Sequence, residues 1–254
     1  MTVEGVGLHT GAPARVRFHL EEGPVRFRVG RVEIPARASR VVETTRATVL
    51  GGEGVRLATV EHLLAALFLR GIWTGLVIEV EGPELPILDG SAAEWLAVLE
   101  GLTPAPLPAA RVPERIRVGD ASSTVMAEPA EGFSVTVSIF FKHPRIGYQS
   151  FESPPRALRE VADARTFGFA HEAEALRAQG LIQGASLRSV LVYGERAPLN
   201  PPRGVDEPVR HKALDFLGDL YLAGRPPLGR FVVHRGAHRW HVELARRLEA
   251  VWQS

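Results

Sequence analysis

Two stretches far apart in the sequence carry side chains whose types could bind a metal ion. The first is Thr59-Val60-Glu61-His62, and the second begins at Arg210 and contains His211 and Asp215. Two imidazoles and one carboxylate suit a catalytic zinc ion, whose fourth position is left for water. Glu61, beside this set, is a candidate to accept a proton from that water. The residue types are consistent with a mononuclear zinc hydrolase.

Each of these signals also has an ordinary structural explanation. His211 and Asp215 are four residues apart, so on a helix they share one face, but such pairs also occur on helix surfaces without a metal. Asp219 repeats the spacing and could orient a neighbouring histidine, or could be a solvated acid. A lone buried histidine such as His62 often only satisfies a backbone carbonyl. Both interpretations stay open from spacing alone.

Two further residues are candidates for acid and oxyanion chemistry. His238 lies in a glycine-containing turn, Arg235-Gly236-Ala237-His238, between a predicted strand and helix, where it could act as a general acid. The alternative is a nonspecific basic cluster with His234 and His241. Thr166 precedes Phe167-Gly168-Phe169, and a glycine between aromatic residues suggests a backbone that approaches a ligand. An ordinary strand threonine is the alternative. No glycine-rich phosphate loop or dinucleotide fingerprint occurs in the sequence.

Each candidate metal-binding histidine is followed by the same series of expected elements. A helix after His62 should end at Gly71 and lead to a strand at Leu76–Val80, with Thr59 as the helix N-cap. A helix over Pro208–Leu222 should end at Gly224 and lead to a strand at Gly229–Val233. The echo favours an internal duplication of two α+β halves packed face to face, although common elements could produce it by chance.

The remaining pattern predicts further strands and helices and one linker. The expected strands are Arg15–Leu20, Val25–Val29, Val32–Ile34, Val41–Thr45, Ile116–Val118, Ser122–Ala127, Phe133–Phe141 and Val190–Tyr193. The expected helices are Ala92–Leu99, Ala170–Ala178 and Trp240–Trp252. Residues 103–113 carry four prolines and are the expected linker. We therefore predict an N-terminal domain over 1–104 and a C-terminal domain over 112–254.

Composition narrows the class of protein. The chain has 254 residues, of which 45% are apolar and 23% charged, as in soluble globular proteins. The absence of cysteine excludes disulfides and thiolate metal sites. A net charge of +1 gives no overall field that favours nucleic acid. No signal peptide or apolar run of membrane-spanning length is apparent, so a cytoplasmic location is expected.

Long motifs occur in a recognisable order: Val6-Gly7-Leu8-His9-Thr10-Gly11, Thr59-Val60-Glu61-His62-Leu63, Pro83-Glu84-Leu85-Pro86-Ile87-Leu88-Asp89-Gly90-Ser91-Ala92, Ala164-Arg165-Thr166-Phe167-Gly168-Phe169, and Arg210-His211-Lys212-Ala213-Leu214-Asp215 through Gly218-Asp219. Together they resemble the UDP-3-O-acyl-N-acetylglucosamine deacetylases, zinc-dependent hydrolases that perform the committed step of lipid A biosynthesis in Gram-negative bacteria. The resemblance covers essentially the whole chain.

The resemblance implies an α+β fold of two similar two-layer domains, with the zinc site at their interface. It also implies a small βαβ insert, about 167–194, in the second domain, whose apolar lining forms a passage for the acyl chain of the substrate. The implied substrate-binding residues are Leu8, Phe167, Leu176, Ala185, Ser186, Val190, Val192 and Arg235.

The resemblance also implies a role for each candidate catalytic residue. His62, His211 and Asp215 would bind Zn²⁺, with Fe²⁺ as an alternative in the cell. Glu61 would be the base, Thr166 an oxyanion donor, and His238 the acid that protonates the leaving amine, with Asp219 hydrogen-bonded to His238. Lys212, one of only two lysines, would contact the glucosamine or the diphosphate together with Arg235.

The expected partner is an acylated UDP-sugar, and the chain is expected to be a monomer without a transmembrane segment that associates at most transiently with the inner membrane. Two alternatives remain: an amidase of the same fold that acts on a smaller acetylated sugar, and a non-catalytic binding module. Three departures from the motif pattern carry expectations of their own. The first strand should be short or absent, and Arg188 and Val190 should alter or narrow the acyl passage and change the preferred chain length.

Overall fold

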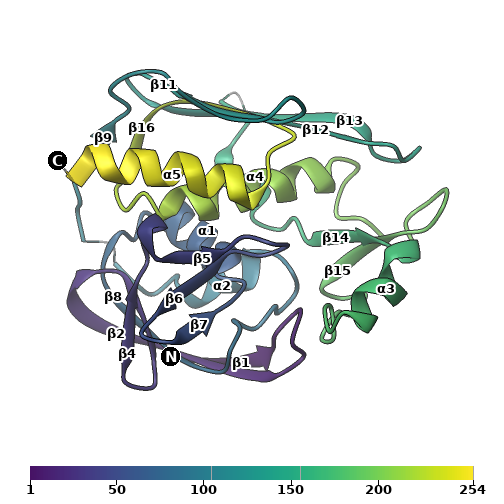
Figure 1. Ribbon diagram of the computed structural model, residues 1–254, viewed down its shortest axis with the longest axis horizontal. Helices are drawn as coiled ribbons and strands as arrows, with labels where there is room; N and C mark the ends of the chain where they lie inside the picture. The colour runs from purple at the N-terminus through teal and green to yellow at the C-terminus, as the bar shows by residue number, and fades with distance from the viewer. Residues whose placement is uncertain (104, 155, 254) are drawn as a thin grey trace.

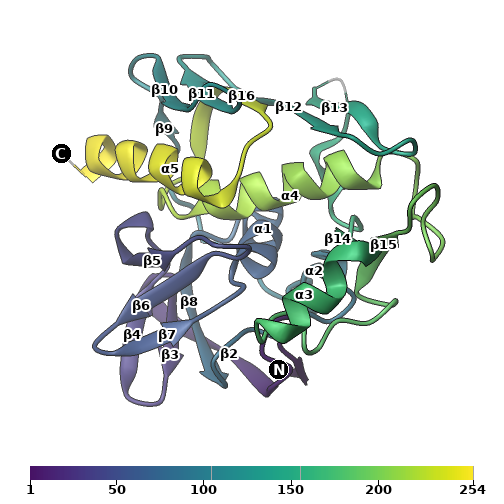
Figure 2. The ribbon, with the colours of Figure 1, turned by 45° about the vertical axis from the view of Figure 1, so that its right-hand side comes forward.

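The protein is an α+β fold in which helices fill the space between two main β-sheets (Figure 1). The computed structural model describes residues 1–103, 105–154 and 156–253. Helices α1 and α2 lie towards the N-terminal sheet, and α4 and α5 lie against the C-terminal sheet (Figures 1 and 2). This arrangement confirms the expected α+β class.

The N-terminal sheet has the strand order β1-β2-β8-β3-β4. Strand β8 is antiparallel to β2 and parallel to β3, and its apolar residues are buried. The bounds of these strands are β1 Thr2–Val6, β2 Pro13–Pro24, β3 Arg26–Val29, β4 Val32–Pro35 and β8 Thr74–Glu81. The first strand, expected to be short or absent, is present and pairs with β2 over its five residues.

The C-terminal sheet repeats this order as β10-β11-β16-β12-β13, with β9 paired to β16. Strand β16 is antiparallel to β11 and parallel to β12, just as β8 is towards its own neighbours. The bounds are β9 Ala110–Arg111, β10 Ile116–Gly119, β11 Thr124–Glu128, β12 Phe133–Phe141, β13 Gly147–Ser153 and β16 Pro227–His234. The two sheets therefore share one topology, which supports the duplication that the sequence favoured.

In each half a helix precedes the central strand. Helix α1 (Glu61–Arg70) leads through Gly71 to β8, and α4 (Glu207–Tyr221) leads through Gly224 to β16. Both glycines have positive φ, 71° and 82°, the left-handed conformation that favours glycine after a helix. Both expected helix ends are confirmed.

The expected N-cap of α1 is wrong. The residue before the helix is Val60, and Thr59 has a left-handed backbone with φ 58°. Its hydroxyl donates instead to the buried carboxylate of Glu84 at 2.7 Å. Glu84 also accepts hydrogen bonds from the backbone N–H groups of His9 and Thr10, so a buried acid joins the N-terminal loop to the start of α1.

Smaller elements complete the frame. Strands β5 (Val41–Glu43), β6 (Val49–Gly52) and β7 (Val55–Leu57) form a separate antiparallel sheet. Strands β14 (Thr166–Phe169) and β15 (Val190–Tyr193) pair in parallel and flank α3 (Ala173–Ala178), beside the two halves (Figure 2). The other helices are α2 (Ala93–Val98) and α5 (His238–Gln253), and 3-10 turns lie at Ala38–Arg40, Leu158–Val161 and Ala170–Glu172.

The core is continuous between the sheets, and α4 lies at its centre. Nearly all residues of α4 are buried. It packs closely on α1 at Gly218, where a Cβ would overlap the carbonyl oxygen of Glu61. The two histidine-bearing helices can therefore approach because one position has no side chain.

The domain boundary stays a prediction, and residue 104 of the expected linker lies outside the described residues. Beyond it, β9 pairs with β16, so the end of the linker joins the C-terminal sheet. Within the described ranges, no helix is both long and apolar enough to cross a bilayer.

Candidate active site

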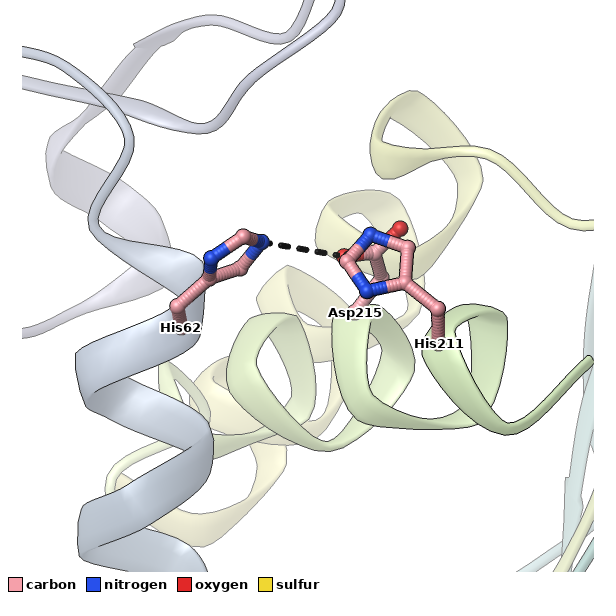
Figure 3. Close-up of side chains that lie close together, drawn as sticks. All are labelled: His62, His211 and Asp215. Carbon is pink, nitrogen blue, oxygen red and sulfur yellow. Dashed lines mark ion pairs between the residues drawn. The ribbon is translucent and has the colours of Figure 1, made fainter. Parts of the chain in front are cut away.

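Side chains from both halves of the chain converge on one point (Figure 3). His62 projects from α1, and His211 and Asp215 project from consecutive turns of α4. Asp215 Oδ1 lies 3.8 Å from His62 Nε2 and 3.4 Å from His211 Nε2. One ligand atom from each residue lies within 4.8 Å of the other two, and all three residues are buried. A divalent cation between these atoms would receive two nitrogen ligands and one oxygen ligand.

The donor chemistry of this triad fits a cation. His211 Nδ1 lies 3.1 Å from the carbonyl oxygen of Ala164, which can only accept, so Nδ1 carries the proton and the Nε2 lone pair is free. Burial lowers the pKa of His62 to about 4 and that of His211 to about 3, so both rings are neutral at pH 7. Burial opposes ionisation of Asp215, but the neighbouring His211 and Lys212 outweigh it and hold its pKa well below the usual value.

Lys212 turns the carboxylate of Asp215 towards the histidines. Its Nζ donates to Asp215 Oδ2 at 2.7 Å, which leaves Oδ1 facing the two imidazoles. The ammonium group also lies 5.6 Å from the centre of the Phe167 ring. The sequence predicted Lys212 as a substrate contact, but it did not predict this hydrogen bond to the proposed metal ligand Asp215.

Glu61 begins α1, directly before His62, and its carboxylate is buried. Oε2 accepts a hydrogen bond from the backbone N–H of Thr48 at 3.1 Å, and Oε1 lies 3.9 Å from His238 Nε2. Burial, with help from Asp219 and Asp215, raises the pKa of Glu61 to about 7 against the opposing effect of His238. A carboxylate of this kind can exchange a proton near neutral pH.

His238 at the start of α5 is held by Asp219. Its Nδ1 donates to Asp219 Oδ2 at 2.7 Å, so its Nε2 faces Glu61. Burial disfavours the charged ring, but Asp219, Glu61 and Asp215 outweigh it and raise the pKa of His238 to about 9. His238 is therefore an imidazolium at neutral pH, as a general acid must be.

Asp219 is the centre of a buried hydrogen-bond network. Oδ2 also accepts from His241 Nδ1 at 2.9 Å, and Oδ1 accepts from the hydroxyl of Thr48 at 2.5 Å. Asp219, His238 and His241 could by distance hold a metal ion, but both imidazoles donate to the same carboxylate oxygen. The arrangement is therefore that of a carboxylate held by hydrogen-bond donors and not that of three metal ligands.

A cavity of about 770 Å³ opens beside these residues. Its walls include Thr166, Lys212 and His238, and seven of the predicted substrate-binding residues: Leu8, Phe167, Leu176, Ala185, Ser186, Val190 and Val192. Thr166 is fixed there because its backbone N–H donates to the carbonyl oxygen of Gly90 at 2.8 Å. The cavity thus connects the βαβ insert with the triad region.

Two residues that were predicted to affect substrate binding, Arg235 and Arg188, lie outside the cavity wall. The cavity wall includes Gly236 and Ala237, whereas Arg235, directly before them, is exposed. Arg188 is also exposed and forms an ion pair with Glu94 on α2. Its side chain therefore points towards the first half of the chain. Of the two residues expected to narrow the acyl passage, only Val190 lines the cavity.

Several residues of the site carry no recognisable signal in the sequence. Thr48 contacts both Glu61 and Asp219, yet it lies in an ordinary Thr-rich run that gave no signal. His9 was noted only within a motif, and it lines the cavity. Other wall residues that were not predicted include Arg46, Phe141, Phe169 and Ile182.

The chain is similar over nearly its whole length to proteins of one family. The family model described as LpxC, UDP-3-O-acyl N-acetylglycosamine deacetylase, matches residues 1–250. Similar proteins named UDP-3-O-acyl-N-acetylglucosamine deacetylase occur in Thermosynechococcus vestitus, 44% identical over 96% of this chain and 90% of the relative, and in Anaeromyxobacter dehalogenans, 42% identical over 97% and 84%. A third, from Myxococcus xanthus, is 40% identical over 97% of this chain and 83% of its own length.

Proposed function

Because the chain belongs to the family of UDP-3-O-acyl-N-acetylglucosamine deacetylases, we propose that it hydrolyses the acetamide of UDP-3-O-acyl-N-acetylglucosamine to UDP-3-O-acyl-glucosamine and acetate, a step of lipid A biosynthesis. The observation that carries the proposal is the convergence of His62, His211 and Asp215 beside Glu61 and His238. A hydrolytic metal site requires such ligands together with a base and an acid.

His62, His211 and Asp215 are the proposed ligands of one Zn²⁺ ion, with Fe²⁺ as an alternative in the cell. When bound, zinc supplies Lewis acidity, which lowers the pKa of a water molecule and polarises a carbonyl group. The protein's part is to present two neutral imidazoles and one carboxylate oxygen, which burial, the Ala164 carbonyl and Lys212 together achieve.

Glu61 and His238 divide the proton transfers. Glu61 accepts the proton of the attacking water, and the Thr48 N–H fixes the orientation of its carboxylate. His238 donates a proton to the departing amine from Nε2, because its Nδ1 is engaged by Asp219. The 3.9 Å between Glu61 Oε1 and His238 Nε2 supports this division, because a base and an acid so close together can both reach one acetamide group.

Thr166 is the proposed donor to the oxyanion, and it lies in the cavity wall with Lys212 and His238. Loss of one such donor typically costs about 3 kcal/mol of transition-state stabilisation. The apolar part of the cavity, from Leu8 to the insert residue Leu176, suits an acyl chain. The proposed contacts for the glucosamine or the diphosphate are Lys212 in the cavity wall and Arg235, which is exposed directly before the wall residue Gly236.

The cavity distinguishes this substrate from a smaller one. An amidase for a short acetylated sugar would have no use for the apolar wall that the insert adds, and a binding module would not need Glu61 and His238 beside the triad. Substrates of graded acyl length test the first point, since activity should depend on the acyl chain; equal rates without it would favour the smaller-sugar amidase. We further propose a cytoplasmic monomer that associates at most transiently with the inner membrane.

The decisive experiment measures metal content and acetate release for the native chain and for Glu61→Ala. We expect about one zinc ion per chain and a fall in rate of roughly 10²-fold or more when the base is lost. Glu131→Ala is the control, because that carboxylate is exposed at the surface. An unchanged rate in Glu61→Ala would remove Glu61 from its role, and a native chain that releases no acetate would contradict the proposed function.

A further inference from the structure

Thr48 links the residues that we assign as base and acid. It is fully buried in the first half of the chain, directly before β6. Its backbone N–H donates to Glu61 Oε2 at 3.1 Å, and its hydroxyl lies 2.5 Å from Asp219 Oδ1. A single residue therefore contacts the base and the partner of the acid, which lie on different helices.

The direction of the hydroxyl bond follows from the state of Asp219. Burial raises the cost of ionising this acid, but His238 and His241 outweigh it and lower its pKa, so the group is a carboxylate that only accepts. Thr48 must then be the donor to Oδ1, while His238 and His241 both donate to Oδ2. Both carboxylate oxygens are satisfied, and the carboxylate cannot rotate without breaking one of these bonds.

We propose that Thr48 is a positioning residue for the deacetylation: its hydroxyl fixes the plane of Asp219 so that Asp219 Oδ2 orients the imidazole of His238, with Nε2 towards Glu61. This inference rests on the proposed function. It assigns Thr48 no contact with the substrate, and its effect passes through Asp219 and His238. The hydroxyl lies 3.3 Å from His238 Nδ1, a longer approach than the 2.7 Å from Asp219, so Asp219 is the principal partner of the ring.

The geometry separates the hydroxyl from the rest of the residue. Every substitution except proline keeps the backbone N–H that reaches Glu61, so side-chain variants test the bond to Asp219 alone. Thr48→Val keeps the shape and removes the hydroxyl, which leaves Asp219 Oδ1 buried without this donor. Thr48→Ser keeps the hydroxyl and removes a methyl group.

The test compares kcat, KM and thermal midpoint for the metal-loaded native chain, Thr48→Val and Thr48→Ser. Loss of an orienting hydrogen bond should lower kcat roughly tenfold. This is a smaller loss than the roughly 10²-fold or greater fall expected when the general acid itself is removed. KM should change little, because Thr48 does not contact the substrate, and Thr48→Ser should retain most of kcat. Thr48→Ala replaces the valine variant if the latter does not fold.

A second measurement does not depend on activity. The imidazole ¹⁵N and ring N–H resonances of His238, assigned by their loss in His238→Gln, are recorded at fixed pH without substrate. They should shift in Thr48→Val and remain native in Thr48→Ser. Native resonances and native kcat in Thr48→Val would overturn the proposal, as would a Thr48→Ser variant as impaired as Thr48→Val. If the native chain releases no acetate, the function fails while the resonances still report on the network.

Discussion

At the scale of single residues, the site shifts the pKa values of an acid and a base in useful directions. Glu61 is buried with few donors, and its pKa is raised to about 7, whereas His238 is buried among carboxylates, and its pKa is raised to about 9. Between these values the carboxylate is ionised and the imidazole is protonated. These are the states needed for a base and an acid in one hydrolysis.

The alkaline side of the pH–rate profile should report on His238. A raised pKa keeps the ring protonated at neutral pH, so activity is retained there and falls as pH rises through about 9. A bound cation repels the imidazolium and moves this limb to somewhat lower pH. The measurement is kcat/KM of the metal-loaded chain across the alkaline range.

Asp219→Asn supplies the comparison for this limb. Asp219 is the largest of the attractive influences on His238, so its neutralisation should move the alkaline limb to lower pH as well as reduce the rate. An alkaline limb in the same place in both proteins would show that another group controls it. His19→Gln is a matched control, because His19 is a partly exposed surface partner of Glu79.

The candidate residues that the sequence indicated, such as His62, His211 and Asp215, have side-chain types that suit metal binding, and the structure brings these three together. Thr48 was missed because its importance comes from a contact with Asp219, 171 residues away, that no local pattern encodes. Thr59 was misassigned as an N-cap because its hydroxyl has a better partner in Glu84, which lies 25 residues along the chain. Tertiary contacts decided both cases.

At the scale of elements, the site depends on how closely α1 and α4 pack. Gly218 on α4 lies against the backbone carbonyl of Glu61 on α1. The proposed base and one member of the triad lie on α1, and the other two members of the triad lie on α4. A second connection comes from Arg165, whose guanidinium pairs with Glu207 at the start of α4 at 2.9 Å, with both side chains buried. The strand that carries Thr166 is thereby tied to the helix that carries His211.

Gly218→Ala should separate the two helices. The added methyl group would overlap the Glu61 carbonyl, and overpacking of this kind typically costs about 1–3 kcal/mol. We expect a lower free energy of unfolding and a loss of metal affinity larger than that loss of stability alone explains, because His62 moves away from His211. Denaturant titration and metal binding measure the two effects.

Gly101→Ala is the control for this substitution, since a Cβ at Gly101 meets no atom within 4 Å. It should leave both stability and metal affinity near native values. If Gly218→Ala also binds metal with native affinity, the close helix packing is not what sets the geometry of the triad.

Most elements were predictable because their apolar periodicity and glycine stops are local signals. The bounds of α4 and β16 fall within a few residues of the expected ones. Strands β6, β7, β9 and β13 were not predicted. β6 ends in two glycines, β7 and β9 have only three and two residues, and β13 is an edge strand with many polar residues, so none of them gives a clear alternating pattern.

At the scale of the whole molecule, a bound ion would connect the two halves. His62 comes from the half with the β8 sheet, and His211 and Asp215 come from the half with the β16 sheet. A ligand that binds only the folded state stabilises it by an amount that grows with the logarithm of the free ligand concentration, about 2.7 kcal/mol when free metal is roughly 100-fold above Kd. The metal should therefore contribute to global stability as well as to catalysis.

Removal of the metal tests this connection. A chelator should lower the thermal midpoint of the native chain and should have little further effect on His62→Ala, in which one ligand is already missing. Differential scanning calorimetry, together with metal analysis, measures both. An equal drop in the two proteins would place the stabilising ion at a different site.

The shared topology of the two sheets has a consequence for how catalytic work is divided. In each half, the residue directly before the histidine is charged: Glu61 before His62, and Arg210 before His211. Arg210 is buried in ion pairs with Asp163 and Asp206, away from the cavity, whereas Glu61 faces His238. The repeated frame is therefore symmetric in its backbone and asymmetric in its charges: one half presents the proposed proton acceptor, and the matching residue of the other half anchors the scaffold.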